Sequence, residues 1–177
     1  MKVCIDAGHG GVDPGAVSDD PFHAEEKHIN LAIAALLEEE LESLGHWVVM
    51  DRRKDRTLSL HARAAFSNRL GADLFVSIHA NAAVTKAAEG MEIFCFPGSV
   101  AGNQAAQTVL NSLAESFPDH KNRGVKEANW TVLRLTTMPA ILVETEFLTN
   151  PDQLNFLSDP VEQQKMAGVI ATGINRI

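Results

Sequence analysis

The chain has 177 residues, enough for one domain with a substantial core, and 45% of them are hydrophobic and 21% charged, as in an ordinary globular protein. A net charge of −8 with scattered basic residues argues against a nucleic-acid partner, and no apolar run approaches the roughly 18 to 20 residues of a membrane span. Cys4 and Cys95 lie in apolar runs without Cys-x-x-Cys spacing, so we interpret both as core residues.

Apolar runs of strand length alternate with stretches of helical period, which indicates an open α/β fold. No repeat or Gly/Ser/Pro linker divides the sequence, so residues 1–177 are predicted to form a single domain. In chain order, strands are predicted at residues 2–6, 47–51, 74–79, 90–96, 131–135 and 140–145. Helices are predicted at residues 25–44, 58–70, 100–117, 151–157 and 160–174.

Capping residues support several of these boundaries. Asn150 and Asp159 each precede a proline at the first position of a predicted helix. Gly45 follows the first long helix, where a left-handed exit residue is needed. Thr57 is predicted to cap the helix at residues 58–70.

Ionisable side chains follow three of the predicted strands. The first strand leads through Asp6 into a glycine-rich turn that contains His9, the third ends at His79, and the last ends at Glu144. In open α/β sheets, ligands bind beyond the carboxyl ends of the strands, so we expect these residues to share a site. Two imidazoles and a carboxylate are a familiar ligand set for catalytic zinc, with the fourth position left to water.

The pattern alone leaves the third protein ligand open among Asp6, Asp13, Glu25 and Glu26. Glu26 lies in line with the apolar stripe of the long helix, and Glu25 lies about 100° round that helix, so periodicity favours Glu26 only slightly. The two histidines and Glu144 also have purely structural interpretations. The Gly-His-Gly turn resembles many ordinary loops, and His79 and Glu144 are compatible with a hydrogen-bonded core histidine and a strand-end charge in water.

Five ordered segments resemble the motifs of zinc-dependent N-acetylmuramoyl-L-alanine amidases, and they span nearly the whole chain. They are residues 5–16 (IDAGHGGVDPGA), 26–31 (EKHINL), 72–81 (ADLFVSIHAN), 122–126 (NRGVK) and 138–144 (MPAILVE). With the six predicted strands, this resemblance implies an open, twisted, mostly parallel six-stranded sheet with helices on both faces. It also implies one Zn²⁺ per chain, held by His9, Glu26 and His79.

The implied reaction is hydrolysis of the amide between N-acetylmuramic acid and L-alanine in peptidoglycan, by attack of a metal-bound water with Glu144 as general base and acid. Asn81 and Arg123 lie in matching motifs and are candidates for substrate contact; their structural alternatives are a turn cap and a loop anchor. A zinc peptidase that cuts within the stem peptide would use the same ligands. A non-catalytic wall-binding module is the second alternative.

One position departs from the family pattern, because Glu146 stands where glycine is usual. Glu146 is expected either to share the face of Glu144 and approach the metal, or to turn away at the strand end. His120 and the other histidines are weaker candidates for the site. The region from His79 to Glu144 leaves little room for the plugging helix of autoinhibited relatives, so an open site without an obligatory protein activator is predicted.

The resemblance implies action on the cell wall, in the periplasm or outside the cell. The first residues enter a strand pattern directly, and Asp6 interrupts the run before a signal-peptide core forms. A phage-type enzyme, a fragment of a longer protein and export by another route therefore remain as alternatives.

Overall fold

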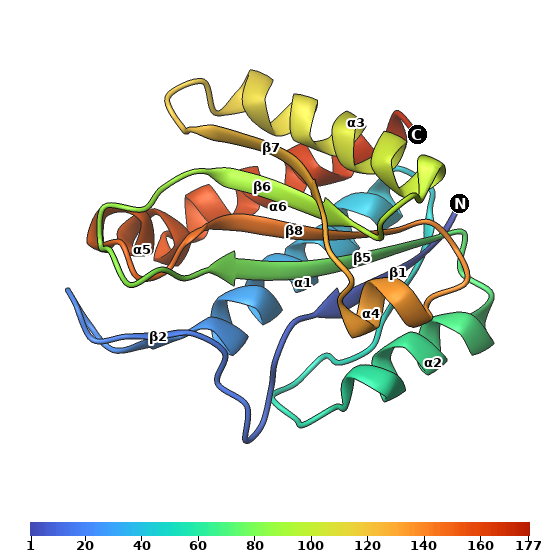
Figure 1. Ribbon diagram of the computed structural model, residues 1–177, viewed down its shortest axis with the longest axis horizontal. Helices are drawn as coiled ribbons and strands as arrows, with labels where there is room; N and C mark the ends of the chain where they lie inside the picture. Colours follow the sequence, from blue (N-terminus) through green and yellow to red (C-terminus); the bar gives the residue numbers. More distant parts are fainter.

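A six-stranded sheet with helices on both faces forms the centre of the computed structural model, which describes residues 1–177 (Figure 1). The strand order is β4-β1-β5-β8-β6-β7, and β6 is antiparallel to β8 while the other pairings are parallel. This confirms the mostly parallel sheet. The strands are β1 (Lys2–Ala7), β4 (Trp47–Met50), β5 (Leu74–Asn81), β6 (Met91–Cys95), β7 (Asn122–Glu127) and β8 (Ala140–Phe147). A separate hairpin pairs β2 (Val17–Ser18) with β3 (Ala24–Glu25).

The helices divide between the two faces of the sheet (Figure 1). The larger core cluster joins one face to α1 (Glu26–Ser43), α3 (Val100–Ser116) and α6 (Pro160–Asn175), with α5 (Pro151–Ser158) beside them. A smaller cluster joins the other face to α4 (Thr131–Leu135) and α2 (Leu60–Leu70). Strand β8 shows the division, because Ile141 and Val143 belong to the larger cluster and Ala140 and Leu142 to the smaller one. Side chains of a strand buried on both faces alternate in this way. No helix combines the length and the apolar character that crossing a bilayer requires.

The prediction of a strand at residues 131–135 is wrong, because this segment is the helix α4. Periodicity does not separate helix from strand over five residues, and here Val132 and Leu133 are the buried pair. The sixth strand is β7 instead. The sequence of β7 is polar and contains Gly124, and as an edge strand it has no fully buried residue, so it lacks the apolar run used to find the others.

The helix caps are confirmed except at α2. The backbone N–H of Asp152 donates to Asn150 Oδ1 at 3.0 Å, and Gly45 has the left-handed φ of 83° after α1. Helix α2 begins at Leu60 and is capped by Ser59, so the predicted cap at Thr57 is wrong. The Thr57 hydroxyl accepts from the backbone N–H of Val12 at 3.1 Å and thereby joins its loop to the turn after β1.

Removing the cap of α6 should lower the stability of the protein. Asp159 Oδ1 accepts the backbone N–H of Val161 at 2.8 Å, and α6 packs against α1 and α3. We expect Asp159→Ala to lower the free energy of unfolding by about 1 kcal/mol in urea titrations. Asp159→Asn keeps an acceptor at this position and serves as the control; an equal loss in both variants would contradict the capping role.

Candidate metal centre

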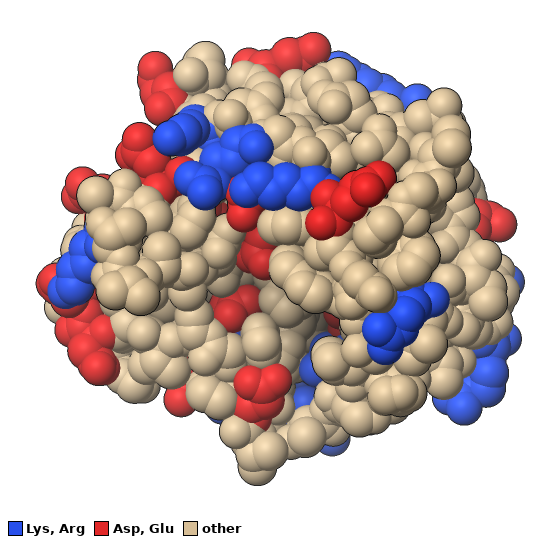
Figure 2. Space-filling model, viewed as in Figure 1, with Lys and Arg blue, Asp and Glu red and all other residues tan.

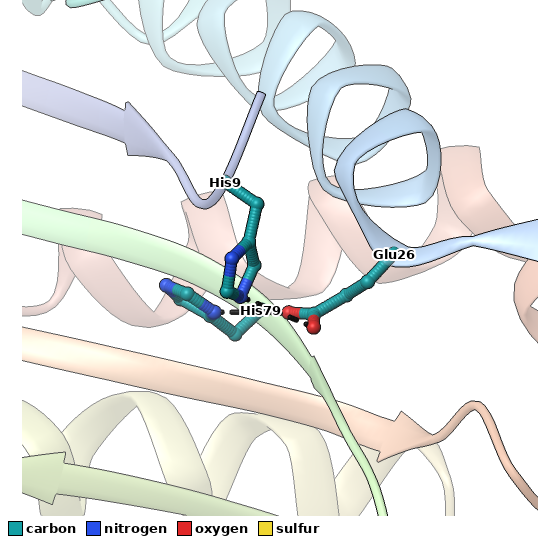
Figure 3. A group of neighbouring side chains, drawn as sticks. All are labelled: His9, Glu26 and His79. Carbon is teal, nitrogen blue, oxygen red and sulfur yellow. Dashed lines mark hydrogen bonds and ion pairs between the residues drawn. The ribbon is translucent and has the colours of Figure 1, made fainter. Parts of the chain in front are cut away.

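Three side chains from separate elements point toward one another at the carboxyl edge of the sheet (Figure 3). His9 follows β1, Glu26 begins α1 and His79 lies near the end of β5. His9 Nε2 lies 3.2 Å from Glu26 Oε2, and His79 Nδ1 lies 2.9 Å from Glu26 Oε1. One donor atom from each residue lies within 4.8 Å of the other two. The structure thus brings together the three residues named as ligands from the sequence.

The other carboxylates that the pattern left open have different partners. Glu25 pairs with Lys27 at 3.0 Å, away from the two imidazoles. Asp13 Oδ2 lies 2.9 Å from Nδ1 of His9, so it contacts the ring nitrogen that faces away from Glu26. A carboxylate in that place orients the imidazole of a metal ligand. Asp6 is buried in an ion pair with Arg63.

Two glycines make room for this cluster. A Cβ atom on Gly15 would lie 2.5 Å from Glu26 Oε2 and 2.6 Å from His9 Cδ2, and Gly15 also has a left-handed φ of 68°. A Cβ atom on Gly8 would lie 2.4 Å from the ring of His79. The glycines of the first motif are therefore required by the close approach of the side chains as well as by the backbone.

Two buried arginines hold the turn that carries His9. Arg52 donates through Nε to the carbonyl oxygen of Ala7 at 2.7 Å and through Nη2 to that of Gly8 at 2.8 Å. Arg63 donates through Nη2 to the carbonyl oxygen of His9 at 2.6 Å. Neither arginine was predicted from the sequence to belong to the site. The available signal was that Arg63 stands next to Ala64 in the predicted helix at residues 58–70. The structure shows that this side of the helix is buried.

A pair of buried carboxyl groups lies behind this turn. Arg63 Nη1 lies 2.6 Å from Asp6 Oδ1 and 3.3 Å from Asp51 Oδ2. Burial, and then the charge of Asp6, raise the pKa of Asp51 to about 9. Burial acts against the charged form of Asp6 too, but hydrogen bonds from Asp51, Ser77 and Arg63, with the charge of Arg63, lower its pKa to about 2. Asp6 is therefore the ionised partner of Arg63, and Asp51 holds a proton at neutral pH.

Without a metal ion, the three candidate ligands are joined by contacts between the imidazoles of His9 and His79 and the carboxylate of Glu26. Burial disfavours the protonated ring of His9, yet hydrogen bonds with Glu26 and Asp13 raise its pKa to about 9. Burial also opposes ionisation of Glu26, but its contacts with His79 and His9 hold its pKa well below the usual range. A divalent cation would replace such protons, because metal binding requires deprotonated imidazoles. The donor set of two histidines and one glutamate fits zinc.

Glu144 lies next to this cluster on the neighbouring strand. It is in register with His79 across the β5–β8 pair and with Glu92 across the β8–β6 pair. Its Oε2 atom is buried and has no hydrogen-bond partner, and burial raises the pKa of Glu144 to about 7. Such a carboxyl group exchanges a proton near neutral pH, which is the property of a general base or acid.

A cavity of about 610 Å³ opens onto these residues. Glu144, His9 and His79 lie on its polar side. Apolar side chains on its other walls come from the start of α2, from α4 and from β8, and they are Leu58, Leu60, Trp130, Val132 and Leu142. The cavity therefore offers a polar reaction centre beside surfaces suited to the apolar parts of a ligand.

A β-bulge decides the orientation of Glu146. His79 pairs with Glu144 and Asn81 pairs with Phe147, so two steps along β5 correspond to three along β8. The extra residue in β8 breaks the alternation of its side chains. Of the two alternatives for Glu146, the structure therefore confirms the second: its side chain turns away from the face of Glu144.

The side chain of Glu146 is fully buried on the opposite face. Its carboxylate accepts the backbone N–H of Gly90 at 2.7 Å and lies 3.0 Å from Nδ1 of His120, whose ring packs edge-on against Phe117 and at a tilt against Phe156. Glu146 joins the start of β6 to the loop after α3, and neither it nor His120 lines the cavity.

The two candidate substrate residues meet at Glu92 and do not line the cavity. Asn81 Nδ2 donates to Glu92 Oε1 at 2.7 Å, and Arg123 Nε donates to Glu92 Oε2 at 2.8 Å. Sequence analysis did not single out Glu92. It stands inside an apolar strand as a buried carboxylate, and that isolation was the available signal.

Known proteins resemble the chain over its whole length. The sequence profile of N-acetylmuramoyl-L-alanine amidases matches residues 3–176. The amidase AmiC of Neisseria meningitidis is 33% identical over 217 aligned residues, which cover 98% of this chain and 52% of the relative, so the chain spans about half the length of that protein. The solved structure of AmiC2 of Nostoc punctiforme has a TM-score of 0.93 at 34% identity, with 99% of this chain and 96% of that chain covered. The CwlD amidase of Clostridioides difficile, solved in complex with the GerS lipoprotein, has a TM-score of 0.94 at 31% identity, with 99% and 96% covered.

The proton on Asp51 should make stability depend on pH. Because its folded pKa of about 9 exceeds the ordinary value of 3.8, the native state holds a proton that the unfolded chain releases above about pH 4. The contribution of Asp51 to stability is complete below that pH and is lost as the pH rises toward 9. We expect this group to lower the free energy of unfolding by up to about 1.4 kcal/mol per pH unit in this window.

Asp51→Asn removes the titrating group and should flatten this dependence, so the variant gains stability relative to the wild type between pH 6 and pH 9. Urea titrations across that range measure the difference, and Asp119→Asn, at an exposed loop position, is the control. Parallel curves for wild type and Asp51→Asn would show that Asp51 holds no such proton.

Proposed function

The chain belongs to the N-acetylmuramoyl-L-alanine amidase family, and from this premise we propose that it hydrolyses the amide between N-acetylmuramic acid and L-alanine in peptidoglycan with one Zn²⁺ per chain. The observation that carries the proposal is the cluster of His9, Glu26 and His79 beside Glu144, at one end of an open cavity. Family membership indicates the bond that is cut, and the cluster supports the metal.

We assign the ligand roles from the contacts around the cluster. His9 and His79 each present one ring nitrogen toward Glu26, and a zinc ion among them would have three protein ligands and an open fourth position. Asp13 would keep the ring of His9 oriented through Nδ1. When bound, zinc would polarise the scissile carbonyl and lower the pKa of water to about 7.

Glu144 would move the proton in this reaction. Its unpartnered Oε2 atom faces no competing donor, so the carboxylate is free to accept a proton from the attacking water. The same group would then donate that proton to the departing nitrogen of alanine, because an amine leaves readily only when it is protonated. Burial of Glu144 next to the apolar cavity walls keeps its proton affinity near that required at neutral pH.

The two alternatives from the sequence are less well supported. A zinc peptidase acting within the stem peptide would use the same ligands, but the profile and the AmiC and AmiC2 relatives described above are those of N-acetylmuramoyl-L-alanine amidases. A non-catalytic wall-binding module has no need for a buried, unpartnered carboxylate beside three convergent donors. The products formed from peptidoglycan distinguish both alternatives from the proposed amidase.

The substrate indicates where the protein acts and what it meets there. We propose action on the cell wall, in the periplasm or outside the cell. The cavity is open beside α4, so we propose that the enzyme works without an obligatory protein activator. The CwlD amidase was solved in complex with the GerS lipoprotein, so a relative of the chain does bind a protein partner.

Mass spectrometry of digested peptidoglycan tests the proposed function. Zinc-supplemented protein should release intact stem peptides with a new amino-terminal alanine and leave peptide-free glycan, and chelation should abolish both products. Cuts within the stem peptide would favour the peptidase instead. Binding to the wall without any cut would favour the wall-binding module.

Substitutions should separate metal binding from proton transfer. We expect Glu144→Gln to retain one zinc per chain and to lose about 10²- to 10⁴-fold in kcat, because the amide cannot take up the proton. His79→Ala should lose both zinc and activity. His61→Ala, at an exposed position of α2 outside the cavity, is the control and should change neither. Metal analysis and peptidoglycan assays give the two readouts, and tightly bound zinc in His79→Ala would refute the ligand assignment.

A further inference from the structure

A second charged cluster lies beside the catalytic residues and is not explained by the chemistry of amide cleavage. Its centre is Glu92 on β6, a carboxylate with 4% exposure that stands opposite Glu144 in the β6–β8 pair. Arg123 and Lys126 of β7 both form ion pairs with Glu92 Oε2. Two cations therefore share one carboxylate, and the cluster carries a net positive charge.

The two cations retain donors for a further partner. Arg123 uses Nε for Glu92 and Nη1 for the carbonyl oxygen of Glu89, and its guanidinium lies 4.9 Å over the ring of Phe147, which fixes its orientation. A guanidinium has five N–H donors and an ammonium has three, so each group has donors left over. The side chain of Arg123 is 28% exposed and that of Lys126 is 40% exposed. Both are thus held from below by Glu92 and open to solvent above.

None of the three cluster residues lines the cavity of about 610 Å³, but the cluster lies beside it, because Glu92 is in register with Glu144, which does line it. Figure 2 shows basic side chains along β7 at the upper edge of a hollow, with acidic side chains on its floor. Lys126 is in register with Phe94, which lies on the face of the sheet that carries the smaller core cluster and Leu142. A ligand that reaches from the reaction centre to Arg123 and Lys126 would therefore lie along this one face of the sheet.

Strand spacing sets the distance between the two centres. β7 is two strands from β8, so its backbone lies roughly 10 Å from that of Glu144. Two extended residues span about 7 Å, and the long side chains on β7 cover the remainder. A carboxylate on the second residue of the stem peptide fits this distance when the first residue, L-alanine, is at the reaction centre.

We propose that Arg123 and Lys126, held by Glu92, form a subsite that binds the free α-carboxylate of the second residue of the stem peptide. This inference rests on the proposed function, because it takes the muramoyl peptide as the substrate. That second residue is a D-glutamate joined through its γ-carboxyl group, so its α-carboxylate is charged unless it is amidated. The glycan side of the scissile bond carries no such charge, so the cations select the orientation in which the peptide lies over β7.

A pair of substrates tests the subsite. Two muramoyl tripeptides that differ only in a free or amidated α-carboxyl group at the second residue are compared with the zinc-supplemented full chain. We expect kcat/KM to be about tenfold higher for the free carboxylate, as for one partly exposed charged hydrogen-bond pair. In Lys126→Met this ratio should fall severalfold, because only Arg123 remains, and in Lys126→Glu, where two carboxylates face one cation, it should invert.

The control and a binding measurement make the result decisive. Lys54→Met removes the same charge from an exposed loop and should keep the tenfold ratio. Calorimetry with Glu144→Gln gives the affinity for both tripeptides without turnover, and the same preference is expected there. Equal cleavage and equal affinity for the two tripeptides would overturn the subsite and leave the amidase function intact. Cleavage of neither by the wild type would refute the proposed function, while a preference in binding alone would still support the subsite.

Discussion

The hydrogen bonds from Arg52 and Arg63 to the carbonyl oxygens of residues 7–9 fix the turn on which the rest of the site depends. Burying two guanidinium groups is costly unless anions and acceptors surround them. Asp6 supplies the charge, Asp51 shares its proton with that carboxylate, and the carbonyl oxygens of Ala7, Gly8 and His9 supply the acceptors. The order at His9 thus originates in buried groups that hold its backbone, and two of them, Asp6 and Arg63, also line the cavity.

The sheet supplies the second half of the arrangement. Register places His79, Glu144 and Glu92 side by side on three neighbouring strands, so one row across the sheet carries a candidate metal ligand, the proposed proton carrier and the carboxylate that pairs with Arg123 and Lys126. Their spacing is set by backbone hydrogen bonds and is therefore insensitive to the conformations of loops. The thin layer formed by α2 and α4 leaves this row accessible, while the thicker layer on the other face provides most of the buried apolar contacts.

The sequence predicted the residues whose local patterns are strong and missed those that depend on partners distant in the chain. Apolar runs located five strands, and the ends of three of them located His9, His79 and Glu144. Periodicity nearly placed Glu26, and the resemblance completed that choice. Strand β7 was not predicted because an edge strand needs no apolar run. Helix α4 was predicted as a strand because five residues do not define a hydrophobic period. The face of Glu146 depends on a bulge created by pairing with β5, and the role of Arg63 depends on carbonyl groups more than 50 positions away.

Strands β6 and β7 run in the opposite direction to β1, β5 and β8, so the two groups of strands meet the site with different ends. β1, β5 and β8 deliver their final residues to the reactive edge, whereas β6 and β7 deliver their first ones. The segments that precede these two strands, residues 82–90 and 117–121, consequently lie at the same edge of the sheet, but neither segment lines the cavity. We expect exchanges in these segments to leave the walls of the cavity in place, because those walls come from other parts of the chain.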